Sequence, residues 1–211
     1  MASDLADPTA RRRFYLMLIR KRARPGSGSS LEMLRRRTWR LPVFPLESIV
    51  QTPFVIVGGV ATRLYAPERM TEDLDVLIAA EDAGRFYAEL QQGGGQRQGR
   101  LTIPGSHWRL PDGSLLDVLE SEEPWVREAL TNPAFAPDGL PVISLPYLIL
   151  LKMRSGRITD LADVSRMLGG AEEDALDQVR AAVRAYQPGD LEDLESVIQL
   201  GRLEYEERQE Q

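Results

Sequence analysis

Two short stretches, Pro53-Phe54-Val55-Ile56-Val57-Gly58-Gly59 and Asp73-Leu74-Asp75-Val76-Leu77-Ile78, decide the fold expected for this chain. The apolar run before the glycine pair is rich in β-branched residues, which is typical of a buried strand. The second stretch alternates and then becomes apolar, which predicts another strand, and Val60 begins a helix between the two. Because residues i and i+2 of a strand point to one face, Asp73 and Asp75 are expected to project together.

This arrangement indicates phosphate and metal chemistry. Neighbouring carboxylates repel each other, and a divalent cation such as Mg²⁺ is the usual remedy. A glycine pair after a strand lets backbone N–H groups approach phosphates at the positive end of a helix. Asp117 lies mid-strand in Leu115-Leu116-Asp117-Val118-Leu119 and is expected to be a third ligand if its strand lies beside that of Asp75, with Glu120 as the less favoured substitute.

The rest of the chain predicts a mixed α/β half followed by a helical half. Helices are expected at 82–91 and 124–130, and short strands at 101–103, 107–110 and 114–119, the last two joined by the turn Pro111-Asp112-Gly113. Further helices are expected at 145–154, 159–168, 171–186 and 191–207. We therefore predict an α+β fold: a small mixed sheet with flanking helices, followed by a C-terminal helical part. The expected divisions are an extension and linker over 1–30, an α/β core over 31–140, and a helical part over 141–211 packed on the core.

Composition excludes several kinds of chemistry. The 211 residues include no cysteine and one histidine, His107, which rules out disulfides, thiolate nucleophiles, cysteine-based zinc sites and sites with several histidines. His107 has no obvious partner in the sequence and is interpreted as a strand or loop histidine. The apolar run Phe14–Ile19 is far shorter than the about 20 residues that cross a membrane. Without a targeting signal, the expected location is the cytoplasm.

The net charge of −6 is unevenly distributed along the chain. Residues 1–50 hold eleven basic and four acidic side chains, a balance of +7, which leaves −13 for the remainder. A basic arm ahead of an acidic body indicates an anionic partner, or docking of the arm on the body. Codon bias toward arginine is the alternative explanation, since only Lys21 and Lys152 are lysines. A helix is expected at 31–40, after a linker at 25–30.

These motifs resemble those of the DNA polymerase β-like nucleotidyltransferase superfamily, in the minimal bacterial form that includes the AbiEii-like toxins. The resemblance begins with Gly58-Gly59 and Arg69-Met70-Thr71-Glu72-Asp73-Leu74-Asp75. It continues in the segment 145–163, where Leu-x-x-x-Lys precedes Arg-x-x-Asp-x-x-Asp, and it covers residues 50–168. The chain departs from the pattern at Gly59, where many members have serine.

The resemblance implies two Mg²⁺ ions and transfer of a nucleoside monophosphate from a nucleoside triphosphate, such as ATP, to an acceptor hydroxyl on a protein, a tRNA or a small molecule. It places Asp73, Asp75 and Asp117 at the metals, and Lys152 near the phosphates or the acceptor. The residues it implies at the nucleotide are Gly58, Gly59, Thr62, Arg69 and Thr71. A partner protein in a toxin–antitoxin pair is a further implication.

Several alternatives stay open. Arg69 either binds a phosphate or pins its loop to the acids, and Lys152 is either catalytic or an exposed helix lysine. Asp160 and Asp163 are interpreted as a helix cap and a packing contact with Arg157, or as support for the site. The alternative function is a catalytically inactive module of the same fold that binds RNA or a protein partner through its basic N-terminal arm.

Overall fold

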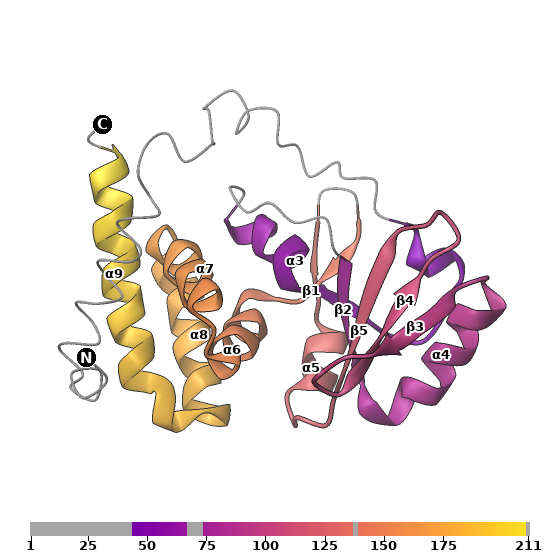
Figure 1. Ribbon diagram of the computed structural model, residues 1–211. Coiled ribbons are helices and arrows are strands. Elements are labelled where there is room, and N and C mark those ends of the chain that lie inside the picture. The colour runs from indigo at the N-terminus through magenta and orange to yellow at the C-terminus, as the bar shows by residue number, and fades with distance from the viewer. Residues whose placement is uncertain (1–43, 67–73, 137–138, 210–211) are drawn as a thin grey trace, which may run out of the picture. The chain divides into compact units, whose positions relative to one another are not determined.

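The computed structural model describes residues 44–66, 74–136 and 139–209 (Figure 1). The described residues divide into two compact units: the sheet unit, which ends at Ile149, and the helical unit, which begins at Leu150. The basic arm, its linker and the helix expected at 31–40 lie outside the described residues, as do Arg69, Thr71 and Asp73. None of the described helices is long and apolar enough to cross a membrane.

A mixed sheet organises the sheet unit. Within the described ranges it has seven strands in the order β3-β4-β5-β2-β1-β7-β6, several of which lie side by side in Figure 1. The β2–β5 and β1–β7 pairs are parallel, and the other neighbours are antiparallel. The strands are β1 (Val55–Val57), β2 (Leu74–Ala79), β3 (Gln96–Arg100), β4 (Gly105–Arg109), β5 (Leu115–Ser121), β6 (Ala134–Phe135) and β7 (Pro141–Val142).

The helices of this unit are α3 (Gly58–Tyr65), α4 (Ala83–Gln92) and α5 (Val126–Thr131), with short 3₁₀ turns at Leu46–Ser48 and Ala80–Asp82. Helix α4 buries the face formed by Ala83, Phe86 and Leu90, which recur at helical spacing. The ring of Phe86 meets Phe54 edge to face at 6.1 Å, and Tyr87 stacks on Trp108 at 5.3 Å. One face of the sheet, the α4 face, is therefore part of the core.

The sequence predicted most of these elements. The strands expected at 54–57, 73–78, 107–110 and 114–119 correspond to β1, β2, β4 and β5, and the turn is confirmed by the Leu110 N–H, which donates to Ser114 O at 2.9 Å. The prediction of a strand at 101–103 is wrong. The strand in this part of the chain is β3, which ends just before it and spans Gln96–Arg100. It is polar and largely exposed, and its register shifts between Arg97 and Gly99, so it has no alternating pattern to detect.

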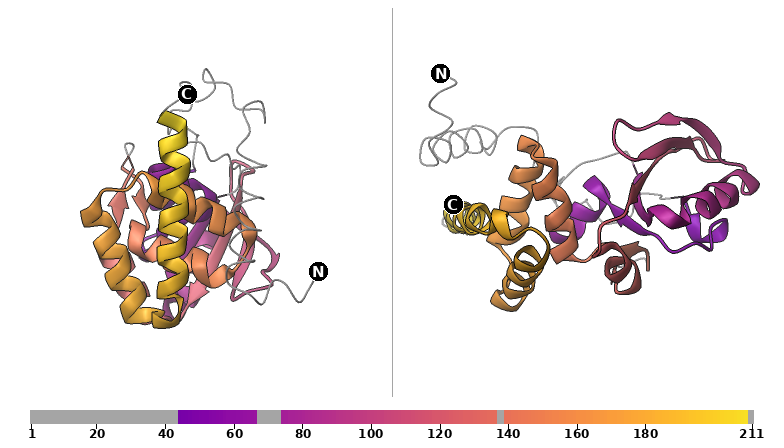
Figure 2. Two further views of the ribbon diagram at one scale, coloured as in Figure 1. Left: turned by 90° about the vertical axis from the view of Figure 1, so that its left-hand side faces the viewer. Right: turned by 90° about the horizontal axis from the view of Figure 1, so that it is seen from below.

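Helix α6 (Leu145–Ser155) begins in the sheet unit, and the helical unit continues with α7 (Ile158–Gly169), α8 (Glu173–Tyr186), a 3₁₀ turn at Pro188–Asp190 and α9 (Leu191–Gln209). These four helices confirm the predicted ones to within a few residues. Helix α9, the yellow helix in Figure 2, packs against α7. Their close approach requires glycine, since a Cβ at Gly201 would lie 2.1 Å from the Ser165 carbonyl oxygen. The α+β class predicted from the sequence is confirmed.

Candidate active site

Three chemically active side chains lie in one row across three neighbouring strands. Asp75 of β2 is the register partner of Asp117 in the parallel β2–β5 pair. Asp117 is in turn the register partner of His107 in the antiparallel β4–β5 pair. Register partners point to the same face of a sheet, with their Cα atoms about 5 Å apart. The structure therefore brings Asp75 and Asp117 together, on the face opposite α4.

His107 is the site residue that sequence reasoning missed. Its Nδ1 lies 2.5 Å from Oδ1 of Asp117, and the two side chains are 47% and 29% exposed. His107 lies on strand β4, which agrees with its interpretation as a strand or loop histidine, but it does have a partner in Asp117. The sequence contained the information needed to predict this pair. Residues 107 and 117 are each five positions from Asp112, at the centre of the turn, so a hairpin about that turn pairs them across its two strands.

A glycine is required where β1 passes into α3. Gly58 has φ +63°, and a Cβ there would lie 2.0 Å from Oδ2 of Asp75. The Asp75 carboxylate therefore packs against the Cα of Gly58, at the first residue of the helix. The N-cap residue of α3 is Val57, whose side chain makes no capping hydrogen bond. The first N–H groups of α3 and the positive end of its dipole suit an anion such as a phosphate.

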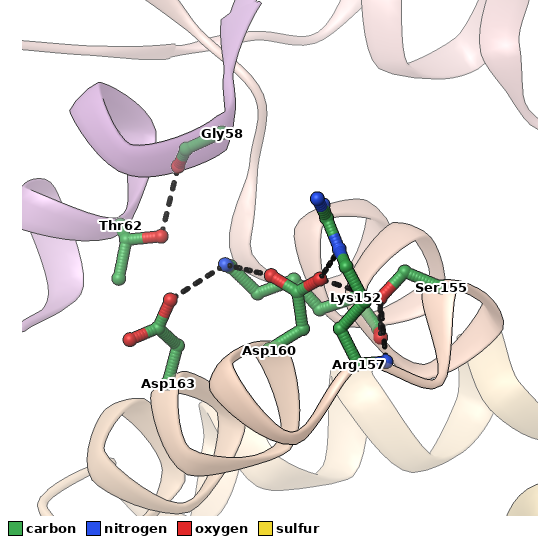
Figure 3. A network of polar contacts seen from close by, with 7 residues as sticks. All are labelled: Gly58, Thr62, Lys152, Ser155, Arg157, Asp160 and Asp163. Atoms are coloured by element: carbon green, nitrogen blue, oxygen red, sulfur yellow. Dashed lines mark hydrogen bonds and ion pairs between the residues drawn. The ribbon is translucent and has the colours of Figure 1, made fainter. Parts of the chain in front are cut away.

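The other described residues expected at the nucleotide are Gly59 and Thr62, both buried in α3. The Thr62 hydroxyl donates to the carbonyl oxygen of Gly58 at 2.8 Å, a bond along the helix that Figure 3 shows. This bond uses the proton of the hydroxyl. The expected contact of Thr62 with the nucleotide stays a prediction, and the observed contact gives it no support.

Glu120 is excluded as a substitute for Asp117. It is the register partner of Ile78 and lies on the α4 face, where it accepts a hydrogen bond from the Tyr87 hydroxyl. Burial, together with this hydrogen bond to Glu120, raises the pKa of Tyr87 to about 12. Alternation along β5 therefore separates the two acids, with Asp117 on one face and Glu120 on the other.

Lys152 belongs to a buried network within the helical unit (Figure 3). Its side-chain amine donates to Asp160 Oδ1 at 2.9 Å and to Asp163 Oδ2 at 2.8 Å, and the residue is only 5% exposed. The alternative of an exposed helix lysine is therefore wrong. The catalytic role of Lys152 stays a prediction, and these ion pairs explain a lysine here without it.

Asp160 holds the second half of this network. Its Oδ2 accepts hydrogen bonds from the Ser155 hydroxyl at 2.5 Å and from Arg157 Nε at 2.8 Å. The expected contact with Arg157 is therefore made by Asp160, and the expected helix cap is wrong, because the N-cap residue of α7 is Arg157. Burial raises the pKa of Asp160, but the hydrogen bonds from Ser155 and Lys152 outweigh it and hold that pKa below its ordinary value. Asp160 is thus a stable carboxylate that neutralises Lys152.

The donor chemistry of the site fits a hard cation. Asp75 and Asp117 supply two neighbouring carboxylates on one face, the type of ligand that Mg²⁺ prefers. Among the described residues, no group of three or more carboxylate or imidazole side chains is arranged to hold a metal ion. The expected third carboxylate, Asp73, lies outside those residues.

No family model and no curated protein matches this chain. Solved structures similar to this chain include the following three. The antibiotic-resistance factor ANT(2″)-Ia is 18% identical with a TM-score of 0.41, over 84% of this chain and 94% of that one. A CCA-adding enzyme in complex with CTP is 15% identical with a TM-score of 0.31, over 87% of this chain and 49% of that one. A cytoplasmic RNA terminal U-transferase is 16% identical with a TM-score of 0.28, over 74% and 42% of the two chains.

Proposed function

We propose that this protein is a nucleotidyltransferase that moves a nucleoside monophosphate from a nucleoside triphosphate to an acceptor hydroxyl. The observation that carries the proposal is the placement of Asp75 and Asp117 side by side on parallel strands, with the start of α3 packed against Asp75. The spacing of the glycine pair and the aspartate pair, which resembles the polymerase β-like motif, supports the same reaction.

Each residue has a defined task in this proposal. Asp75, Asp117 and the expected Asp73 would hold two Mg²⁺ ions, which would neutralise charge at the phosphates and lower the pKa of the acceptor hydroxyl. The N–H groups at Gly58 and Gly59 bind phosphate oxygens, and Arg69 and Thr71 add contacts to the same triphosphate. The acceptor oxygen forms a bond to the α-phosphorus, the bond to the bridging oxygen breaks, pyrophosphate leaves and the hydroxyl proton passes to solvent.

The finer points of the proposal rest on the motif resemblance. They are ATP as the nucleotide, a cytoplasmic location, and a protein, a tRNA or a small molecule as the acceptor. A partner in a toxin–antitoxin pair belongs to the same set. The AbiEii-like subtype is the member of the superfamily that the Arg69-x-Thr71-x-Asp73-Leu74-Asp75 spacing favours.

The experiment measures Mg²⁺-dependent binding of each α-labelled triphosphate, and transfer of its label to cell-extract components. Asp117→Asn should abolish transfer. Glu120→Gln is the matched control, because it changes an acid of the same strand on the opposite face, and it should transfer as the wild type does. Salt-sensitive RNA binding that disappears when residues 1–29 are deleted, with no triphosphate binding, would instead support the inactive module.

A further inference from the structure

A depression of about 380 Å³ extends from Asp117 across the strands β5, β4 and β3. Its lining consists of Gln98, His107, Trp108, Arg109, Leu115 and Asp117. The depression therefore begins beside Asp117 and extends away from Asp75, toward β3 at the edge of the sheet. The proposed function assigns nothing to this space, although a transferase needs a second substrate beside its metal ligands.

The lining offers several kinds of contact. His107 is held at Nδ1 by Asp117, which leaves the other ring nitrogen, Nε2, for a ligand. Gln98 contributes an amide from the irregular part of β3, and Arg109 contributes a guanidinium. Leu115 is 50% exposed and provides an apolar wall. Such a mixture suits a ligand that carries hydroxyl groups on a carbon skeleton.

Charge and size narrow the class of ligand. The positive charge of Arg109 and the negative charge of Asp117 give the lining a formal net charge of zero. The arginines of β3 do not add to this face: Arg97 lies over the Tyr87 ring at 5.2 Å, and Arg100 pairs with Ser106, which hydrogen-bonds to Trp108 within the core. A nucleic acid requires a row of cations along its backbone. The volume is within the range of small-molecule sites, about 300–1,000 Å³.

We infer that this depression is the acceptor subsite, and that the acceptor is a small, uncharged, polyhydroxylated molecule. The inference rests on the proposed function, since it names the second substrate of the same reaction. His107 contacts the acceptor through its free ring nitrogen, while Asp117 fixes the orientation of the ring. Gln98 and Arg109 bind further hydroxyl groups, and Leu115 packs against the carbon skeleton.

The test separates the acceptor site from the nucleotide site. A cell extract is divided by ultrafiltration into a small-molecule filtrate and a retentate of proteins and RNA, and each is incubated with the protein, Mg²⁺ and α-labelled triphosphates. Leu115→Trp fills the depression with an indole. Ile103→Trp is the matched control, because Ile103 is 55% exposed in the same unit but does not line the depression.

We expect label to appear in the filtrate. Leu115→Trp should lose at least about tenfold in transfer, and Ile103→Trp should lose none. Triphosphate binding should be unchanged in both variants.

Gln98→Ala removes only a hydrogen bond at the surface, and should raise the KM for the labelled filtrate component about five- to tenfold with the KM for the triphosphate unchanged. Label in the retentate alone, label in neither fraction, or wild-type kinetics in both lining variants would overturn the inference. Failure of the wild type to bind any triphosphate would contradict the proposed function itself.

Discussion

The two units of the molecule each contain a pair of neighbouring aspartates, and they treat the pair differently. In the helical unit, Asp160 and Asp163 share one lysine, Lys152, and all three side chains are buried. In the sheet unit, Asp75 and Asp117 lie side by side, and the group bound to Asp117 is the half-exposed imidazole of His107. The first pair is bound by a buried ammonium group, while Asp117 remains partly open to solvent.

This difference separates stability from function. A buried lysine held between two carboxylates stabilises the folded chain only while both ion pairs stay intact, because an unpaired buried charge is costly. Carboxylates side by side on an accessible face instead repel each other and gain from an added cation. Removal of charge should therefore damage the fold in the helical unit and damage the reaction in the sheet unit.

The largest effect is expected from Lys152→Met. It removes the buried cation that Asp160 and Asp163 share, and should lower the free energy of unfolding by about 3–5 kcal/mol. Arg157→Met is the matched control, since Arg157 contacts the same Asp160 from the exposed surface and should cost less than about 1 kcal/mol. Urea unfolding measures both. Equal costs would show that burial does not distinguish the two cations.

Asp75→Asn should have the opposite profile. Transfer should fall about 10²–10³-fold, because a metal contributes several kcal/mol of charge stabilisation to the transition state, while the variant stays folded. Asp73→Asn is expected to act in the same way. Asp163→Asn is the counterpart in the helical unit and should lower stability while transfer by the folded protein is retained. Near-wild-type transfer by Asp75→Asn would remove this residue from the site.

Two glycines with almost the same backbone conformation test the comparison more finely. Gly58 has φ +63° and Gly156 has φ +62°, but only Gly58 has the Asp75 carboxylate in the place of a Cβ. Gly58→Ala and Gly156→Ala should each cost about 1–2 kcal/mol of stability from the left-handed conformation. Only Gly58→Ala should also lower transfer and Mg²⁺-dependent triphosphate binding, because it displaces Asp75. Unchanged triphosphate binding by Gly58→Ala would contradict the proposed contact.

The smallest effect concerns pH. The pKa of Asp160 is lowered in the folded chain from an ordinary value of 3.8, so the unfolded chain binds the proton more tightly. The stability from this carboxylate is therefore present above pH 3.8 and is lost as the pH falls through the lower folded value. Urea unfolding on either side of that pH should show a smaller acid dependence in Asp160→Asn than in the wild type. If the free energy of unfolding depends on pH equally in Asp160→Asn and the wild type, other carboxylates cause the loss of stability in acid.

Local pattern made much of the site predictable. The alternation around Leu74 placed Asp75 on one face of a strand, and the glycine pair marked the turn into α3. The pairing of His107 with Asp117 was also within reach, because a tight hairpin turn fixes the register of both its strands. In contrast, β6 and β7 have two residues each, too few for any periodic pattern.

By itself, then, the sequence determined the α+β class, the strand that carries Asp75 and the turn that follows β1, since these depend on the periodicity of neighbouring residues. Only the tertiary structure decided that β2 lies parallel to β5 with Asp75 opposite Asp117, because no turn links these strands directly and their register depends on packing. It also decided that Lys152 is buried between Asp160 and Asp163. A lysine in a helix has the same local pattern whether its ammonium reaches solvent, a phosphate or two carboxylates, and the fold of α6 onto α7 selects among them.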